Sequence, residues 1–255
     1  MLASGPAAAV EAAEVVAELK AFNANSRYDL PLLRAEELDA LIGGQTVRRL
    51  ENAKDERPAR ALALVLTTVP REDVWWSCQD PHFSAGPEMI DMLLDRQGPD
   101  RETWYGLLDA PVPLADRQWV VDIWNEHGVA QASAGRHWEH GWRLRADGPA
   151  LIATALASGA ATKLPPERAE SAVWLEASEG AWVALSLSDG TTLFGYHSVA
   201  SLGGAVPDWI VGRVAYAGLD KMMRRIIDRA AARAGHYTAG HAPVYDGAGQ
   251  AIPIR

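Results

Sequence analysis

The chain has 255 residues with 24 Lys+Arg and 33 Asp+Glu, so its formal charge at pH 7 is −9. Apolar residues make up 48% and charged residues 22%, a balance typical of globular proteins that excludes a disordered or fibrous chain. The acidic balance argues against nucleic-acid binding, because phosphate contacts need clustered Lys and Arg. The single cysteine, Cys78, excludes an internal disulfide framework and a thiolate zinc site.

The sequence has no apolar run of the ~18–20 residues that a membrane span needs. Residues 1–6 lack the basic region of a secretory signal, and Glu11, Glu14 and Glu18 interrupt the apolar stretch that would have to follow it. We therefore expect a cytoplasmic protein, unless a signal sequence was removed from its start.

Short helices and short strands alternate in the first part of the chain. Apolar residues at helical spacing predict helices over residues 7–22, 34–42 and 70–79, with another helical turn over residues 89–94. Residues 46–50 and 61–68 have the composition of strands. The charged run between these two strands suits an exposed loop.

Strands dominate the middle of the chain. Aromatic and β-branched residues predict them over residues 103–109, 117–125, 138–145, 171–177, 181–187 and 191–199. Turns are predicted at residues 147–148, 178–180 and 188–190. Residues 151–157 fit either a helix or a buried strand.

A long helix is predicted from Pro207 to about Ala234. Apolar residues recur on it every three or four positions and form one wide stripe, while charged residues occupy the other side. A strongly bent antiparallel sheet wrapped around the helix is the economical way to cover that stripe. The sequence therefore predicts an α+β protein with a curved antiparallel sheet around a long C-terminal helix.

Three segments are similar to motifs that belong together in one family. Residues 69–75, followed by Asp80, resemble a motif that leads from a strand into a helix. Residues 110–121 resemble a motif at the start of a strand. Residues 203–211 resemble a Gly-Gly-x-Leu-Pro-x-Trp motif that leads into a C-terminal helix. Their order and spacing over residues 45–234 resemble the START (steroidogenic acute regulatory protein-related lipid-transfer) family of the helix-grip, or SRPBCC, superfamily.

The resemblance implies a helix-grip fold with an apolar cavity between the sheet and the long helix, and it places residues 203–207 near the mouth of that cavity. It divides the chain into an N-terminal helical segment that packs on the domain (1–44), the START-like domain (45–234) and a C-terminal tail (235–255). Matching the motifs to the family, together with the alternation of side chains along each strand, gives a set of expected ligand-binding residues. They are Trp104, Leu108, Trp119, Val121, Ile123, Trp182, Tyr196, Leu202, Ala215, Gly218, Leu219, Met222, Met223 and Ile226.

The chain departs from the family's pattern where sterol-binding members often place an acidic residue and an arginine inside the cavity. The matching positions here are Trp104 and Ile123, both apolar. Loss of both members of such a pair is physically coherent, because an unpaired buried charge is costly. The guest is then expected to be more uniformly apolar or differently anchored.

Binding and transfer of a lipid or other hydrophobic small molecule is the favoured function, with no cofactor, metal or catalytic residue expected. The enzymatic alternative is a polyketide cyclase or aromatase that uses Tyr196, His197, Ser198 and Glu176 in the same cavity. A third possibility is an interaction module whose Trp and Met residues simply fill the core.

Basic residues follow one another along the second half of the long helix. They could guide transient docking on an anionic membrane, or they could simply complement the helix dipole. These residues are Lys221, Arg224, Arg225, Arg229 and Arg233.

The histidines do not form a recognisable metal motif. His137 and His140 would point to opposite faces of a strand, and polar packing explains them better than metal binding. His236 and His241 lie in a Gly/Ala/Pro-rich segment and are expected to be solvated. Cys78 is expected to act as a small buried hydrophobe.

Overall fold

The computed structural model describes residues 10–51, 59–80, 89–110, 114–201, 203 and 208–254, with the backbone only for residues 208–215 and 217. Eight of the strands form one antiparallel path in the order β1-β2-β9-β8-β6-β5-β4-β3, and β7 pairs in parallel with β5. The strands are β1 (Val47–Glu51), β2 (Ala59–Thr67), β3 (Met89–Arg96), β4 (Arg101–Leu108), β5 (Arg117–Asn125), β6 (His137–Leu144), β7 (Val173–Trp174), β8 (Ala177–Ser186) and β9 (Thr192–Ser201).

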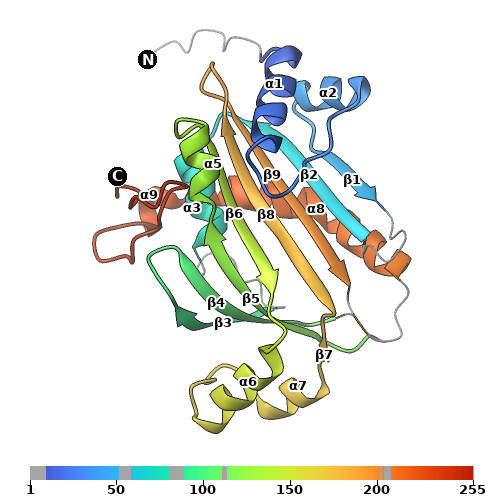
Figure 1. Cartoon of the computed structure of the whole chain (residues 1–255), viewed down its shortest axis with the longest axis vertical. Coiled ribbons are helices and arrows are strands. Elements are labelled where there is room, and N and C mark those ends of the chain that lie inside the picture. Colours follow the sequence, from blue (N-terminus) through green and yellow to red (C-terminus); the bar gives the residue numbers. More distant parts are fainter. Residues whose placement is uncertain are drawn as a thin grey trace.

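Helices lie on both sides of the sheet (Figure 1). They are α1 (Ala12–Asn23), α2 (Ala35–Ile42), α3 (Arg71–Gln79), α5 (His127–Ala132), α6 (Gly148–Ala157), α7 (Pro166–Ser171), α8 (Asp208–Ala230) and α9 (Arg233–His236). In Figure 1, α8 crosses behind the strands and α1 lies in front of them. We call the face on which α8 lies the inner face and the opposite one the outer face. No helix among the described residues has the length and apolar character needed to cross a membrane.

Two apolar clusters cover the outer face. In the first cluster, Val15, Leu19 and Phe22 of α1 pack against strand residues that include Leu62 and Val183. These helix positions recur every three or four residues, so they form one stripe that the sheet can bury. The other cluster lies over the opposite end of the sheet, where α6 and α7 cover β3, β4 and β5. It contains Met92, Tyr105, Leu107, Val120, Ile152, Ala161, Leu164 and Ala172.

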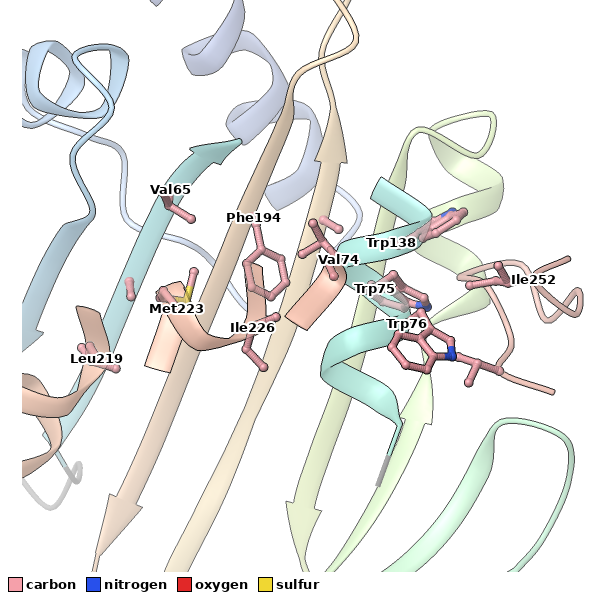
Figure 2. Packing of buried hydrophobic residues seen from close by; sticks show 14 of the residues in the cluster. Val65, Val74, Trp75, Trp76, Trp138, Phe194, Leu219, Met223, Ile226 and Ile252 are labelled. Atoms are coloured by element: carbon pink, nitrogen blue, oxygen red, sulfur yellow. The ribbon is translucent and has the colours of Figure 1, made fainter. Parts of the chain in front are cut away.

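The inner face is covered over part of its width. Helix α8 packs on β1, β2 and β9, and α3 packs between α8 and β8. Trp75 and Trp76 of α3 are both fully buried and lie between the strands and the C-terminal segment (Figure 2). Cys78, on the same helix, is half-buried against this cluster, and burial raises the pKa of its thiol.

The last residues of the chain pack into the same core. Tyr237, Val244 and Ile252 are buried in the cluster that contains Trp75 and Trp76. The Tyr237 hydroxyl donates a hydrogen bond to the carbonyl of Ile252 at 2.9 Å. The segment expected to be a tail therefore contributes to the core of the domain.

The strand predicted over residues 171–177 is reduced to the two residues of β7, because Ser171 ends α7. Two other local predictions are wrong. Residues 89–94, predicted as a helical turn, form β3, because Ile90 and Met92 pack on the outer face while Asp91 and Leu93 alternate to the inner one. Residues 178–180, predicted as a turn, continue β8, where Gly180 pairs with Ser198. Tertiary pairing overrides local propensity at both places. The segment 151–157, which fitted helix or strand, is helical.

A buried carboxyl on β6 makes the stability of the fold depend on pH. Glu139 is fully buried, and one of its carboxylate oxygens accepts a hydrogen bond from Ser26 at 2.8 Å. Burial raises the pKa of Glu139 from 4.5 to about 7, although the Ser26 hydrogen bond opposes this shift. The folded protein therefore binds this proton more tightly than the unfolded chain does. Stability is lost as pH rises from about 4.5 through about 7.

We predict that Glu139→Gln increases the free energy of unfolding by roughly 1–3 kcal/mol more at pH 8 than at pH 5, because Gln cannot ionise. Urea denaturation of both proteins at the two pH values measures this difference. An equal effect of the substitution at both pH values would show that folding does not raise the pKa of Glu139.

Candidate functional site

The strand residues expected to bind ligand all lie on the inner face. Trp104 pairs with Val121 across β4 and β5, and Trp182 pairs with Tyr196 across β8 and β9. Paired residues point to the same side of a sheet, as do every second residues along a strand. Following the pairing from β2 to β3 places one set on the side of α8. This set is Trp104, Leu108, Trp119, Val121, Ile123, Trp182 and Tyr196.

Five aromatic side chains lie on this face, and we call them together the aromatic wall: Trp104, Trp119, Trp142, Trp182 and Tyr196. Trp142 stacks on Tyr196 with ring centroids 5.5 Å apart. The ring centroid of Trp182 lies 4.6 Å from that of Tyr196. Trp182 also stacks on Phe194 of the core, with ring centroids 5.5 Å apart. The wall therefore continues directly from the core.

A glycine lets Trp119 lie flat on the sheet. A Cβ atom at Gly106, its partner on β4, would lie 2.4 Å from the indole ring of Trp119. No side chain fits there without moving that ring. The indole of Trp119 therefore packs closely against β4 at Gly106.

The exposure of the expected residues differs between the wall and the helix. All five members of the wall are half-buried, as are Leu108, Ile123 and Met222. Leu219, Met223 and Ile226 of α8 are at most 5% exposed and pack against Phe194 and its neighbours. The space beneath residues 219–230 is therefore filled by side chains, and the accessible apolar surface lies beside α8 on the inner face.

Three other expected positions can be placed only in part. Gly218 is exposed, and no described atom lies within 4 Å of a Cβ built on it. Leu202 lies outside the described residues, as does the side chain of Ala215. Of the expected mouth, residues 203–207, the structure describes Gly203, whose carbonyl accepts a hydrogen bond from Arg117 at 3.4 Å.

The inner face also carries polar groups that the sequence analysis missed. Asp91 pairs with Gly106 across β3 and β4, so it faces the same side as the aromatic wall. Burial raises the pKa of Asp91, opposed by the positive charge of Lys163. Glu102, also on this face, accepts a hydrogen bond from the indole nitrogen of Trp104 at 2.7 Å. If residues 89–94 had been predicted as a strand, the alternation of side chains would have placed Asp91 on the inner face.

The residues named for cyclase chemistry are split between the two faces. Tyr196 and Ser198 point inward, whereas His197 points outward and contacts the ring of Tyr28, with centroids 4.7 Å apart and the planes tilted by 60°. Burial lowers the pKa of His197 to about 3 and raises that of Tyr196. Glu176 is exposed between β7 and β8. His197 therefore cannot act as a base on the inner face.

Most of the remaining histidines make ordinary polar contacts. The Nε2 atom of His137 lies 2.5 Å from Glu18 on the outer face, which fastens α1 to β6. His140 points inward, with its Nδ1 2.7 Å from the side-chain oxygen of Asn125. The prediction of opposite faces for these two is confirmed. The prediction that His241 is solvated is wrong, because its side chain is 13% exposed and faces Asp80.

The basic residues of α8 fall into two groups. Arg233, just beyond α8, is 4% exposed, pairs with Asp73 and donates to the carbonyl of Pro253 at 2.6 Å. It therefore fastens the C-terminal segment instead of facing a membrane. Lys221, Arg224 and Arg225 are exposed on α8.

We predict that Gly106→Ala lowers the free energy of unfolding by about 1–3 kcal/mol, because the new methyl group must displace the indole of Trp119. In a Trp119→Ala background the same change should cost less than about 0.5 kcal/mol, since no ring remains to be displaced. A double-mutant cycle by urea denaturation measures the coupling. Additive effects of the two substitutions would contradict the packing described for this pair.

Comparison with solved structures found the same arrangement of sheet and helix elsewhere. Human STARD10 matches with a TM-score of 0.54 and 13% identity, over 74% of this chain and 76% of that one. A STAR-related lipid transfer protein from Xanthomonas axonopodis matches with a TM-score of 0.49 and 16% identity, over 74% of this chain and 92% of that one. The Zhui aromatase/cyclase of a Streptomyces species matches with a TM-score of 0.44 and 13% identity, over 68% of this chain and 94% of that one.

Neither a protein-family model nor a curated protein matches the sequence. The fold is nevertheless clear from its parts: an open antiparallel sheet, a long C-terminal helix across its inner face, and the superposition on STARD10. This chain has the START-like helix-grip fold.

Proposed function

We propose that this protein binds a lipid or another hydrophobic small molecule on the aromatic wall of the inner face. The observation that carries the proposal is the position of Trp104, Trp119, Trp142, Trp182 and Tyr196, which are half-buried on one face of the sheet. Fold by itself does not fix function, so the argument depends on this surface.

The energetics favour a guest on this surface. Apolar surface left in water costs about 25 cal/mol per Å², and each methylene of a guest contributes ~0.8 kcal/mol on burial. Leu93, which faces the same side next to Trp104, is 42% exposed. Rigid indole rings give large contact areas at low entropic cost. An acyl chain or polycycle can therefore bind here without an ion pair.

A polar end of the guest has partners on the same face. The Asp91 carboxyl accepts hydrogen bonds on this face. The hydroxyl of Tyr196 can donate one, as a tyrosine does near neutral pH. These groups favour an amphiphilic guest with a hydrogen-bonding polar end near β3 or β9.

The competing functions explain less of the surface. A packed interaction module accounts for Met223 and Ile226, which are buried, but it does not explain why the wall is only half-buried among the described residues. A cyclase needs a base that reaches the guest, and His197 lies on the opposite face. We therefore favour a binding protein that performs no chemistry on its guest.

Transfer between membranes extends the proposal. Lys221, Arg224 and Arg225 place positive charge on the exposed side of α8. Arg224 is partly neutralised by Asp220 at 3.0 Å, so Lys221 and Arg225 are the better candidates for contact with anionic lipid headgroups.

Two tryptophans on β5 allow a matched test of the wall. Trp119 lies on the inner face and Trp124 on the outer face, and both are half-buried. We predict that Trp119→Ala weakens binding of the fluorescent fatty acid cis-parinaric acid by at least about 10-fold, whereas Trp124→Ala changes it less than about 2-fold. Equal losses in the two variants would contradict a guest on the inner face.

A charge next to the wall should also prevent binding. Met222 is half-buried on α8, so Met222→Arg should abolish copurification of lipid in native mass spectrometry, because an unpaired charge would be buried beside the guest. Leu32→Arg, at a residue 49% exposed, is the control and should retain lipid. Lipid bound to a folded Met222→Arg variant would show that this side of α8 does not face the guest.

Transfer should depend on the two exposed cations. Replacing both Lys221 and Arg225 by Glu should slow transfer of cis-parinaric acid to anionic vesicles by about 10-fold and leave transfer to neutral vesicles unchanged. Replacing the exposed Lys20 and Arg27 by Glu makes the same change in net charge away from α8. Equal slowing by both pairs would indicate a net-charge effect instead of docking through α8.

A further inference from the structure

A carboxylate and two imidazoles converge where α3 meets the C-terminal segment. Asp80, directly after α3, has a fully buried side chain. The Nε2 atoms of His236 and His241 lie 3.4 and 2.9 Å from its Oδ2 atom. All three groups offer a ligand atom within 4.8 Å of one another. We call these three residues the Asp–His cluster.

The fold holds the cluster in place from several sides. Asp80 donates its backbone N–H to the carbonyl of Trp76 at 3.0 Å, which ends α3 at this residue. The Trp76 ring contacts both imidazoles, with centroids 5.5 Å from His236 and 6.1 Å from His241. Gly240, at φ +94°, turns the chain back so that His241 returns to the site.

The distances suit a shared metal ion. A divalent ion about 2.0–2.2 Å from each ligand atom, with angles between tetrahedral and octahedral, holds neighbouring ligand atoms roughly 2.9–3.5 Å apart. The two distances from Asp80 to the imidazoles, 2.9 and 3.4 Å, fall in this range.

A hydrogen bond also fixes the tautomer of His241. Its Nδ1 atom lies 2.6 Å from the carbonyl oxygen of Ala242, which can only accept, so Nδ1 carries the proton. In a neutral imidazole the lone pair then lies on Nε2, directed at a carboxylate oxygen of Asp80. A cation between the two groups satisfies both, and an N–H to backbone carbonyl contact is the usual support of a metal-ligating histidine.

The surroundings leave the site accessible and negatively charged. Asp80 and His241 line a pocket of about 100 Å³ together with Asp100, Glu102 and Ile123. Arg96 also lines it and pairs with Glu102 at 2.5 Å. The pocket reaches the inner face of the sheet through Ile123. Among the described residues, the three ligand atoms would lie on one side of a metal ion here, and the pocket would lie next to it.

We propose that Asp80, His236 and His241 bind one divalent transition-metal ion of the zinc class. Two imidazoles and one carboxylate are ligands that suit Zn²⁺ and its first-row neighbours, whereas Mg²⁺ and Ca²⁺ prefer oxygen ligands. Three protein ligands leave a position for water or for a polar group of a guest. This proposal does not depend on the aromatic wall being a ligand surface.

The test uses metal-free protein prepared with a chelator and titrated with Zn²⁺ and, separately, with Co²⁺. We expect one ion per chain and a visible absorption spectrum of Co²⁺ in a nitrogen and oxygen environment. At a Zn²⁺ concentration 100-fold above Kd, Tm should rise by roughly 5–10 °C. Asp80→Asn and His236→Ala should each weaken Zn²⁺ binding by at least about 100-fold, because loss of a metal ligand lowers the affinity more than loss of a group that only orients a ligand.

The control is His127→Ala, at a histidine whose Nε2 lies 2.5 Å from Asp100 and belongs to no three-ligand cluster of the described residues. It should bind Zn²⁺ as the unchanged protein does. His236 is 36% exposed, so its replacement should leave the metal-free fold intact, which circular dichroism checks. If Zn²⁺ binds the unchanged protein no tighter than a folded His236→Ala variant, the cluster is an ion pair of Asp80 with protonated imidazole, and the proposal is wrong.

Discussion

One open sheet has to bury two faces with a limited number of helices, and this constraint shapes the whole molecule. On the outer face, α1 and α2 cover one end of the sheet and α6 and α7 cover the other. On the inner face, α8 and α3 cover β1, β2, β9 and β8, where Trp75 and Trp76 fill the space between helix and sheet. The aromatic wall lies at the edge of this covered area: Trp182 and Tyr196 pack against the core, while Trp104, Trp119 and Trp142 lie on β4, β5 and β6. Among the described residues, α8 and α3 leave this surface half-buried.

The aromatic wall and the Asp–His cluster lie close to one another in the fold. The C-terminal segment is fastened by the pairing of Arg233 with Asp73 and by the hydrogen bond from the Trp75 indole nitrogen to the carbonyl of Tyr245 at 3.0 Å. The same segment brings His236 and His241 to Asp80, beside a pocket that reaches Ile123. The two proposed sites are therefore neighbours, and each proposal can be tested without the other.

Alternation along strands was enough to predict one face of the site. Trp119, Val121 and Ile123 share a face because their spacing is two residues, and no tertiary information is needed to see this. Asp91 was missed because its segment is apolar enough to resemble a helix, and pairing with β4 decides its conformation. The filling of the core beneath α8 depends on side-chain volumes meeting in three dimensions, which periodicity does not encode. The Asp–His cluster joins residues far apart in the chain, so sequence spacing gave no signal for it.

The central claim is that the accessible apolar surface beside α8 holds a water-insoluble guest. A crystal structure of the protein soaked with a fatty acid brominated near the end of its chain tests it most directly, because anomalous scattering locates the bromine. The account predicts bromine density within contact distance of Trp119, Trp142 or Trp182. Bromine only on the outer face, or none in a crystal whose protein is otherwise well ordered, would contradict it.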